Sequence, residues 1–352
     1  MSISPLRSPI KYPGGKRKLI PEILQRLPVD LSLLCEPFFG GGSLGLQLAG
    51  EGKLRRLVAG EACEPVRALW EAVANSPFVL RDFLRNYAEI YNVDPFRAYD
   101  DMRTQLNSSR SLELSPARIG ALLLALNKTC NNGIVRFNRA GEFNVPIGKK
   151  QDGSFHRFKP DFDHLERCQR ALRGAAFQIY PTWMEALALA DLADGWTPER
   201  ARAGDWSVYA DPPYTGGFVG YTPEGWTSDD DIKLFTALAW ASDYGARVVL
   251  SQPDTEWSRD CCAQLLKGWQ VDSLGVGRPV NSDGEGRGPV GELLIWNKPV
   301  ERVTVPVDID LRLRADYSTS DSLRVMAPAQ PAIISVNITT DPIPEADDGG
   351  LV

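Results

Sequence analysis

Residues 35–45 read Cys-Glu-Pro-Phe-Phe-Gly-Gly-Gly-Ser-Leu-Gly and lie between a leucine-rich run at 31–34 and a second one at 44–48. The first run predicts a strand and the second predicts a helix. Glycines between a strand and a helix allow a tight turn and the close approach of a ligand to backbone N–H groups. The loop contains no Gly-Lys-Ser/Thr, which excludes a P-loop. The stretch therefore predicts the first turn of a doubly wound α/β sheet.

An acidic residue follows the next predicted strand. Residues 57–59 read Leu-Val-Ala, and this run ends near Glu61. A carboxylate at this position can accept hydrogen bonds from ribose hydroxyls. A solvated loop carboxylate explains Glu61 equally well, so this residue alone does not identify a cofactor site.

Residues 211–214 read Asp-Pro-Pro-Tyr and follow the apolar run Trp-Ser-Val-Tyr-Ala at 206–210. The two prolines fix φ and remove backbone donors. Asp211 adds a carboxylate acceptor and Tyr214 adds a flat aromatic face, so the tetrapeptide can bind a planar amine. A Pro-Pro turn after a strand is the simpler interpretation of the tetrapeptide alone, but the glycine-rich loop favours a ligand site.

The order of the predicted elements indicates an α/β fold with a Rossmann-like sheet. Residues 8–70 alternate helix and strand, and residues 76–126 have apolar side chains at helical spacing. Residues 130–150 predict a β-hairpin that turns near 139–141. Further strands are predicted at 177–180, 207–210, 248–251 and 293–296, and a loop is predicted at 281–289.

Composition excludes several classes of protein. The 352 residues contain no apolar run of about eighteen residues and no apolar signal-peptide core near the start, so we expect a cytoplasmic protein without a membrane span. The six cysteines form no Cys-x-x-Cys pair and there are only two histidines, His156 and His164. We therefore expect reduced, buried thiols and no metal site.

The net charge of −6 is unevenly distributed. Residues 301–352 hold nine acids and four bases, whereas residues 128–159 hold seven bases and two acids. A second basic group consists of Arg7, Lys11, Lys16, Arg17 and Lys18. Local positive patches attract phosphates whatever the total charge. The polar, Pro-rich residues 301–352 predict a poorly ordered acidic tail, in which residues 303–313 alternate enough to form one strand.

Together these motifs resemble the Dam-type DNA adenine-N6 methyltransferases, the alpha group of the D12 class. Lys-Tyr-Pro-Gly-Gly-Lys at 11–16 resembles the family's N-terminal cofactor motif, and Leu-Ser-Gln-Pro-Asp at 250–254 resembles a strand end of the family. The recognition hairpin is matched by Asn-Gly-Ile-Val-Arg-Phe-Asn at 132–138 and by Gly-Glu-Phe-Asn-Val-Pro-Ile-Gly at 141–148. Residues 278–296 resemble the family's late Arg…Glu-Leu-Leu segment, and the resemblance covers about residues 8–299.

The resemblance implies methyl transfer from S-adenosylmethionine, without a metal, to N6 of an adenine flipped out of duplex DNA. Asp211 and the Pro212 carbonyl would accept the two N6–H bonds, Pro213 would hold the turn, and Tyr214 would stack on the adenine. The implied cofactor residues are Tyr12, Lys16, Phe38, Gly40, Gly42, Glu61, Asp211 and Trp183. Tyr12 stands where the family commonly has tryptophan, and Glu61 where it commonly has aspartate.

The resemblance also implies a target-recognition domain at 71–170, inserted into a catalytic domain at 1–70 and 171–300. The Dam-type hairpin targets GATC, where Arg136 would read a guanine and Ile134 and Pro146 would touch a thymine methyl. Further contacts to bases or phosphates are expected from Lys11, Asn132, Asn138, Lys149 and Lys150. Asn131 replaces a frequent aromatic wedge. The expected partner is double-stranded DNA, and the expected state in solution is a monomer.

Two other functions fit the same residues. An amino-methyltransferase of this fold can act on cytosine N4 instead of adenine N6. A catalytically silent DNA-binding regulator could also retain the fold, although the intact glycine loop and the intact Asp211–Tyr214 tetrapeptide argue against it.

Overall fold

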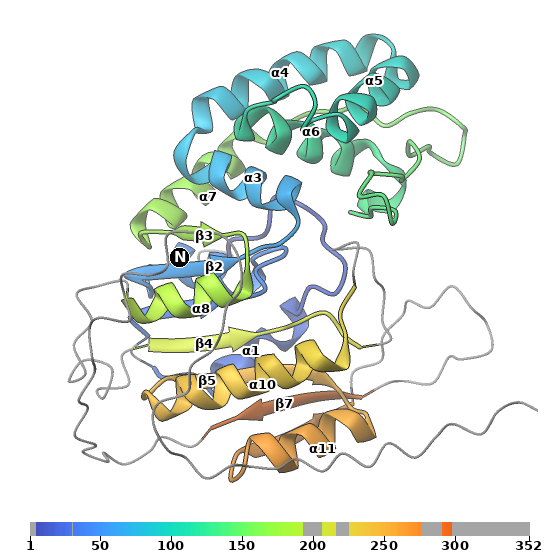
Figure 1. Cartoon of the computed structure of the whole chain (residues 1–352). Helices are drawn as coiled ribbons and strands as arrows, with labels where there is room; N and C mark the ends of the chain where they lie inside the picture. The colour runs from blue at the N-terminus through green and yellow to red at the C-terminus, as the bar shows by residue number, and fades with distance from the viewer. Residues whose placement is uncertain (1–4, 30, 193–205, 216–224, 276–290, 298–352) are drawn as a thin grey trace, which may run out of the picture. The chain divides into compact units, whose positions relative to one another are not determined.

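A seven-stranded sheet in the order β3-β2-β1-β4-β5-β7-β6 lies at the centre of the fold (Figure 1). The computed structural model describes residues 5–29, 31–192, 206–215, 225–275 and 291–297. The predicted loop at 281–289, the predicted tail at 301–352 and the strand considered at 303–313 lie outside these residues.

Five strands of the sheet pair in parallel and two pair antiparallel. The parallel strands are β1 (Leu33–Glu36), β2 (Arg56–Gly60), β3 (Gln178–Tyr180), β4 (Trp206–Ala210) and β5 (Arg247–Pro253). The antiparallel strands are β7 (Glu292–Trp296), which pairs with β5, and β6 (Gln270–Leu274), which pairs with β7. The predicted doubly wound α/β fold is confirmed. Strand β6 was not predicted, because its side chains alternate only between partial burial and exposure.

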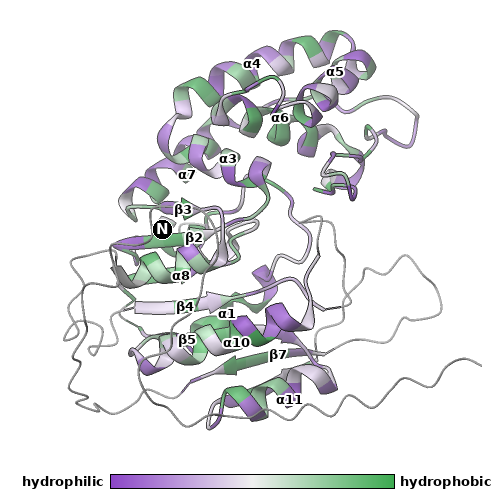
Figure 2. Ribbon diagram, viewed as in Figure 1, coloured by the Kyte–Doolittle hydropathy of each residue, from purple (hydrophilic) through white to green (hydrophobic). Residues whose placement is uncertain are grey.

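Helices cover both faces of the sheet, which is why its five central strands, β2, β1, β4, β5 and β7, are buried along most of their length. Helices α1 (Ile20–Leu24), α2 (Ser43–Gly50), α3 (Glu64–Asn75) and α7 (Phe162–Gly174) share one core cluster with Leu34 and Leu57. Helices α8 (Trp183–Leu192), α10 (Ser228–Asp243) and α11 (Glu256–Leu265) share the other with Leu33 and Val58. Figure 2 shows hydrophobic residues in the middle of the strands and mixed residues along the helices.

Three further helices form one end of the described fold (Figure 1). They are α4 (Pro77–Val93), α5 (Pro95–Asn107) and α6 (Pro116–Thr129). Each begins at a proline, whose fixed φ suits the first helical position, and Asp94 and Ser115 cap α5 and α6 through their side-chain oxygens. Helix α6 is almost entirely buried between α3, α4 and α5. The predicted helical region at 76–126 is therefore three helices.

The predicted hairpin at 130–150 is present, but it contains isolated bridges instead of regular strands. Antiparallel bridges join Cys130 to Ile147 and Phe137 to Phe143, and the structure describes every residue between them. A 3₁₀ turn, η2 (Asn131–Gly133), interrupts the first arm with Asn132 at a φ of 58°. The predicted hairpin is thus an antiparallel chain reversal with isolated bridges where a regular hairpin has a ladder.

Two further observations bear on the class of protein. Within the described ranges, every helix is too short or too polar to cross a lipid bilayer. All six cysteines are buried free thiols.

Candidate functional site

The sheet reverses its winding direction between β1 and β4. These strands pair in parallel, and the chain leaves β1 toward β2 and β3 but leaves β4 toward β5. Open α/β sheets bind ligands at such a switch point, beside the carboxyl ends of the strands. The glycine-rich loop follows β1 and the tetrapeptide 211–214 follows β4, so both predicted motifs lie at this crevice.

The glycine-rich loop turns tightly against Tyr12. Gly40 and Gly42 have φ values of 47° and 60°, a region that L side chains rarely adopt. A Cβ on Gly40 would lie 2.8 Å from Cε1 of Tyr12, and a Cβ on Gly42 would lie 2.6 Å from Cζ of Phe39. These two positions therefore require glycine, because Tyr12 and Phe39 occupy the space that a side chain would need.

Two buried glutamate side chains hold this loop. Oε2 of Glu61 accepts a hydrogen bond from the Gly40 N–H at 2.9 Å, and its Oε1 accepts one from the Cys63 N–H at 2.8 Å. Oε1 of Glu36, at the end of β1, accepts a bond from the Gly45 N–H at 2.6 Å. Burial raises the pKa of Glu61 to about 7 and the pKa of Glu36 to about 8.

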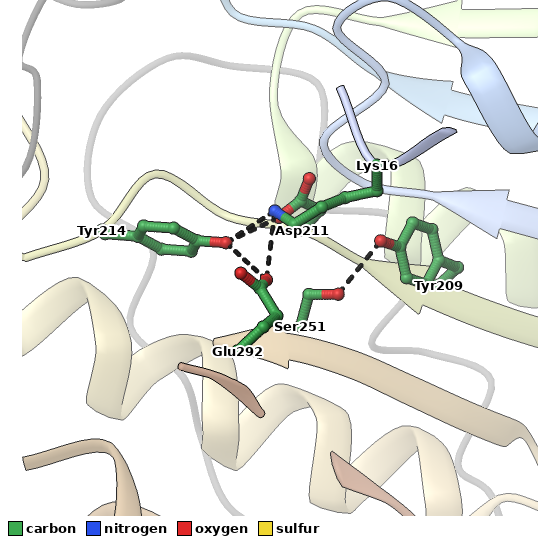
Figure 3. Close-up of polar contacts among 6 residues, drawn as sticks. All are labelled: Lys16, Tyr209, Asp211, Tyr214, Ser251 and Glu292. Atoms are coloured by element: carbon green, nitrogen blue, oxygen red, sulfur yellow. Dashed lines mark hydrogen bonds and ion pairs between the residues drawn. The ribbon is translucent and has the colours of Figure 1, made fainter. Parts of the chain in front are cut away.

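Four polar side chains meet beside the tetrapeptide (Figure 3). Nζ of Lys16 lies 2.5 Å from Oδ1 of Asp211, 2.6 Å from the hydroxyl of Tyr214 and 3.2 Å from Oε1 of Glu292. The Tyr214 hydroxyl also donates to Oε1 of Glu292 at 2.8 Å. One ammonium thus joins two carboxylates that come from β7 and from the end of β4.

Asp211 combines a fixed oxygen with an accessible one. Its side chain is 20% exposed, and Oδ2 has no hydrogen-bond partner among the described residues. Burial raises the pKa of Asp211, and the nearby Lys16 ammonium acts in the opposite direction. The site can offer Oδ2 as an acceptor to a ligand that donates a hydrogen bond.

Aromatic rings line the crevice next to the loop. Phe38 stacks on Trp183 with centroids 6.2 Å apart and meets Trp226 edge-on at 5.4 Å. Trp226 is fixed because its Nε1 donates to the buried Asp231 at 2.7 Å. Phe38 and Trp183 were predicted from the sequence, but Trp226 was not, because its aromatic character alone does not separate it from a core residue.

The chain reversal at 130–150 presents one face to solvent. Val135, Phe143 and Val145 are buried, whereas Ile134 and Pro146 alternate with them and are exposed. Arg136 is partly exposed and donates from Nε to Oδ1 of Asn144 at 2.8 Å. Asn132, Lys149 and Lys150 are also exposed. The side chain of Asn138 instead caps the turn, where it bonds to the backbone of Ala140 and to the backbone and side chain of Glu142.

Side-chain amides of two helices hold this segment in place. Asn107 accepts from the Phe143 N–H at 2.7 Å and donates to its carbonyl at 3.2 Å. The buried Asn127 pairs in the same way with the backbone of Lys11 and also donates to the Gly133 carbonyl at 2.7 Å. Sequence reasoning missed both, because an asparagine in a helix gives no sign of its distant partners.

The residues predicted from the sequence thus fall into two groups. Lys16, Asp211 and Tyr214 meet at the crevice, where Tyr12 and Glu61 contact the glycine-rich loop. Lys11, at the other end of the motif 11–16, packs its Cδ against Gly133 at the start of the chain reversal. Among the described residues, no three His, Cys, Asp or Glu side chains gather closely enough to hold a metal ion.

Comparison with known proteins gives a consistent result. The family model described as D12 class N6 adenine-specific DNA methyltransferase matches residues 12–172 and 197–272. The chain is 29% identical to a DNA adenine methylase of Vibrio cholerae over 300 residues, which cover 83% of this chain and 96% of that protein. It is 27% identical to the DNA adenine methylase of Escherichia coli K12 over 305 residues, covering 83% and 96%. It is 25% identical to the type II methyltransferase M.MjaIII of Methanocaldococcus jannaschii over 308 residues, covering 82% and 98%.

Proposed function

The chain belongs to the D12 class N6 adenine-specific DNA methyltransferases, and from this premise we propose that it methylates the adenine of GATC in duplex DNA after flipping that base out of the helix. The observation that carries the proposal is the acceptor Oδ2 of Asp211, which has no hydrogen-bond partner among the described residues. The target atom lies inside the base stack of duplex DNA, so the chemistry requires an extruded base.

The amino group of adenine is a weak nucleophile because its lone pair is delocalised into the ring. Asp211 and the Pro212 carbonyl would accept its two N–H bonds and so stabilise the positive charge that develops on nitrogen. Pro213 would hold the turn. Tyr214 would stack on the flipped base, a contact worth roughly 1–3 kcal/mol. When bound, S-adenosylmethionine supplies the electrophilic methyl group.

The residues at the crevice fit this cofactor. The glycine turn at Gly40 and Gly42 would bring the loop backbone close to the bound cofactor. Each oxygen of Glu61 accepts one N–H bond and has a second lone pair that a ribose hydroxyl could use. Phe38 and Trp183 offer an aromatic surface for the adenine ring. Tyr12, Lys16 and Asp211 would complete the binding site.

Target recognition would come from residues 71–170, inserted into a catalytic part at 1–70 and 171–300. The guanidinium of Arg136 carries five N–H donors, so its bonds to Asn144 leave others for a guanine edge. Ile134 and Pro146 lie on the same exposed face and would contact a thymine methyl. Lys11, Asn132, Asn138, Lys149 and Lys150 would supply further contacts to bases or phosphates.

Methyl transfer to unmodified duplex DNA, followed by mapping of the modified base, tests this proposal. We expect N6-methyladenine at GATC, and we expect no product from Asp211→Ala, whose fold should be retained. Duplexes with single-base changes in GATC serve as controls. Methylation of another adenine site would refute GATC alone, modified cytosine would establish N4 methylation, and wild-type turnover by Asp211→Ala would remove Asp211 from the mechanism.

A further inference from the structure

Glu292 reaches the crevice because β7 is antiparallel to its neighbour. It is the first residue of β7 and pairs with Pro253, the last residue of β5. The parallel strands end at this edge of the sheet, whereas β7 begins there. Glu292 therefore lies at the same edge as Asp211, although 81 positions separate them in the numbering.

A carboxylate at this position is costly for the fold alone. Glu292 is 1% exposed, and the rest of β7 reads Leu-Leu-Ile-Trp. A buried ion pair is often no more stable than an apolar residue of similar size, since both charges lose their hydration. Stability therefore does not account for Glu292, and its contacts indicate what else it does.

Two of its contacts among the described residues are with groups that touch Asp211. A single oxygen of Glu292, Oε1, lies 3.2 Å from the Lys16 ammonium and 2.8 Å from the Tyr214 hydroxyl (Figure 3). Lys16 and Tyr214 in turn approach only Oδ1 of Asp211, at 2.5 and 3.2 Å. Glu292 thus fixes the partners of one Asp211 oxygen while the other oxygen stays accessible.

We propose that Glu292 is a positioning residue for methyl transfer, which holds the Lys16 ammonium and the Tyr214 hydroxyl so that Asp211 presents Oδ2, and Tyr214 presents its ring, to the target base. This inference rests on the function proposed above. Without the Glu292 carboxylate, Lys16 keeps the Asp211 carboxylate but loses that of Glu292, and the Tyr214 hydroxyl loses an acceptor 2.8 Å away. Both the carboxylate and the ring would then lose their fixed orientation.

Single-turnover methyl transfer at saturating DNA and S-adenosylmethionine tests this role. The amplitude reports the fraction of active enzyme, whereas the rate constant reports the chemistry. We expect Glu292→Gln to lower the rate constant roughly 10- to 100-fold at an unchanged amplitude, the range caused by small misplacements in an active site. A purely structural role would lower the amplitude and the midpoint of thermal unfolding and leave the rate constant unchanged, which would overturn the inference.

A double-mutant cycle with Tyr214→Phe tests the route of the effect. If Glu292 acts partly through the Tyr214 phenol, Glu292→Gln will lower the single-turnover rate constant by a smaller factor in the Tyr214→Phe background than in the wild type. An equal loss of rate constant in both backgrounds would show that Glu292 does not act through the phenol. Glu166→Gln removes an exposed helical ion pair with Arg170 and is the matched control.

A second variant decides the question if Glu292→Gln does not fold. Glu292→Asp keeps the charge but is one methylene shorter, so we expect a lowered rate constant, and a wild-type value would overturn the inference. A wild-type enzyme that transfers no methyl group to adenine would overturn the proposed function itself. Methylation of adenine at equal rates by the wild type and Glu292→Gln would overturn this inference alone.

Discussion

Glu36→Gln should remove a pH dependence of stability that is built into the glycine-rich loop. Glu36 is 3% exposed, and burial raises its pKa to about 8 from an ordinary value of 4.5, while the Gly45 N–H opposes this shift and the nearby Asp211 carboxylate adds to it. Between these two pH values the folded chain keeps a proton that the unfolded chain loses. The stabilisation from the protonated Glu36 is therefore complete below about pH 4.5 and is lost as the pH rises toward 8.

One linked proton changes the free energy of unfolding by about 1.4 kcal/mol per pH unit. From pH 5 to pH 8 the wild type should therefore lose about 3–4 kcal/mol relative to Glu36→Gln. Glutamine resembles the protonated acid and retains the oxygen that accepts the Gly45 N–H, so the two proteins should be similarly stable at pH 5. Glu61, whose pKa is also raised, is present in both and cancels in the difference.

Urea unfolding followed by tryptophan fluorescence at pH 5, 6, 7 and 8 measures this difference directly. The exposed substitution Glu166→Gln is the control and should follow the wild type at every pH. Parallel curves for the wild type and Glu36→Gln would refute the reasoning, because they would mean that Glu36 is ionised in the folded protein across this range.

Three other substitutions test separate parts of the structure. Lys16→Met should shift the acidic side of the pH–rate profile for methyl transfer to higher pH, because the ammonium that lowers the pKa of Asp211 is lost. An unchanged acidic side of the profile would contradict this. Asn127→Ala removes three hydrogen bonds made by a buried amide and should lower the free energy of unfolding by roughly 3 kcal/mol. A loss below about 1 kcal/mol in urea titration would be inconsistent with the observed bonds. Arg136→Ala should relax selectivity at one base pair by about 1–3 kcal/mol, measured from methylation rates on single-base variants of GATC. Arg139→Ala, at the exposed turn, is the control and should leave selectivity unchanged. A uniform loss of rate on all sequences would make Arg136 a phosphate contact.

Local patterns predicted the parts of the fold that depend on neighbouring residues. The glycine-rich loop between a strand and a helix, and the apolar runs at 206–210 and 293–296, identified strands that the structure confirms to within a few residues. These features were predictable because each depends on a short stretch of sequence with a strong conformational preference. Lys16 was predicted as a cofactor residue from the motif at 11–16, but its contacts with Asp211 and Tyr214 were not predicted.

The features that sequence reasoning missed depend on contacts between distant parts of the chain. Glu292 precedes an apolar run, and only the antiparallel insertion of β7 brings it to the crevice. Asn127 lies in a helix that was predicted from its leucines, and its partners are the backbone of Lys11 and Gly133. The hairpin at 130–150 was predicted, but its single bridges were not, because the pairing of its arms depends on contacts with the helices that hold it.

The asparagine contacts have a consequence for changing the specificity of the enzyme. The backbone of residues 130–150 is held by Asn107 and Asn127, which bind its main chain and do not depend on which side chains it carries. The proposed recognition side chains of Ile134, Arg136 and Pro146 can therefore be replaced while these main-chain bonds remain, although the side-chain bonds from Arg136 to Asn144 are lost. A library randomised at these three positions should yield mostly folded enzymes, some of which methylate new sequences, and the same library in an Asn107→Ala background should yield few.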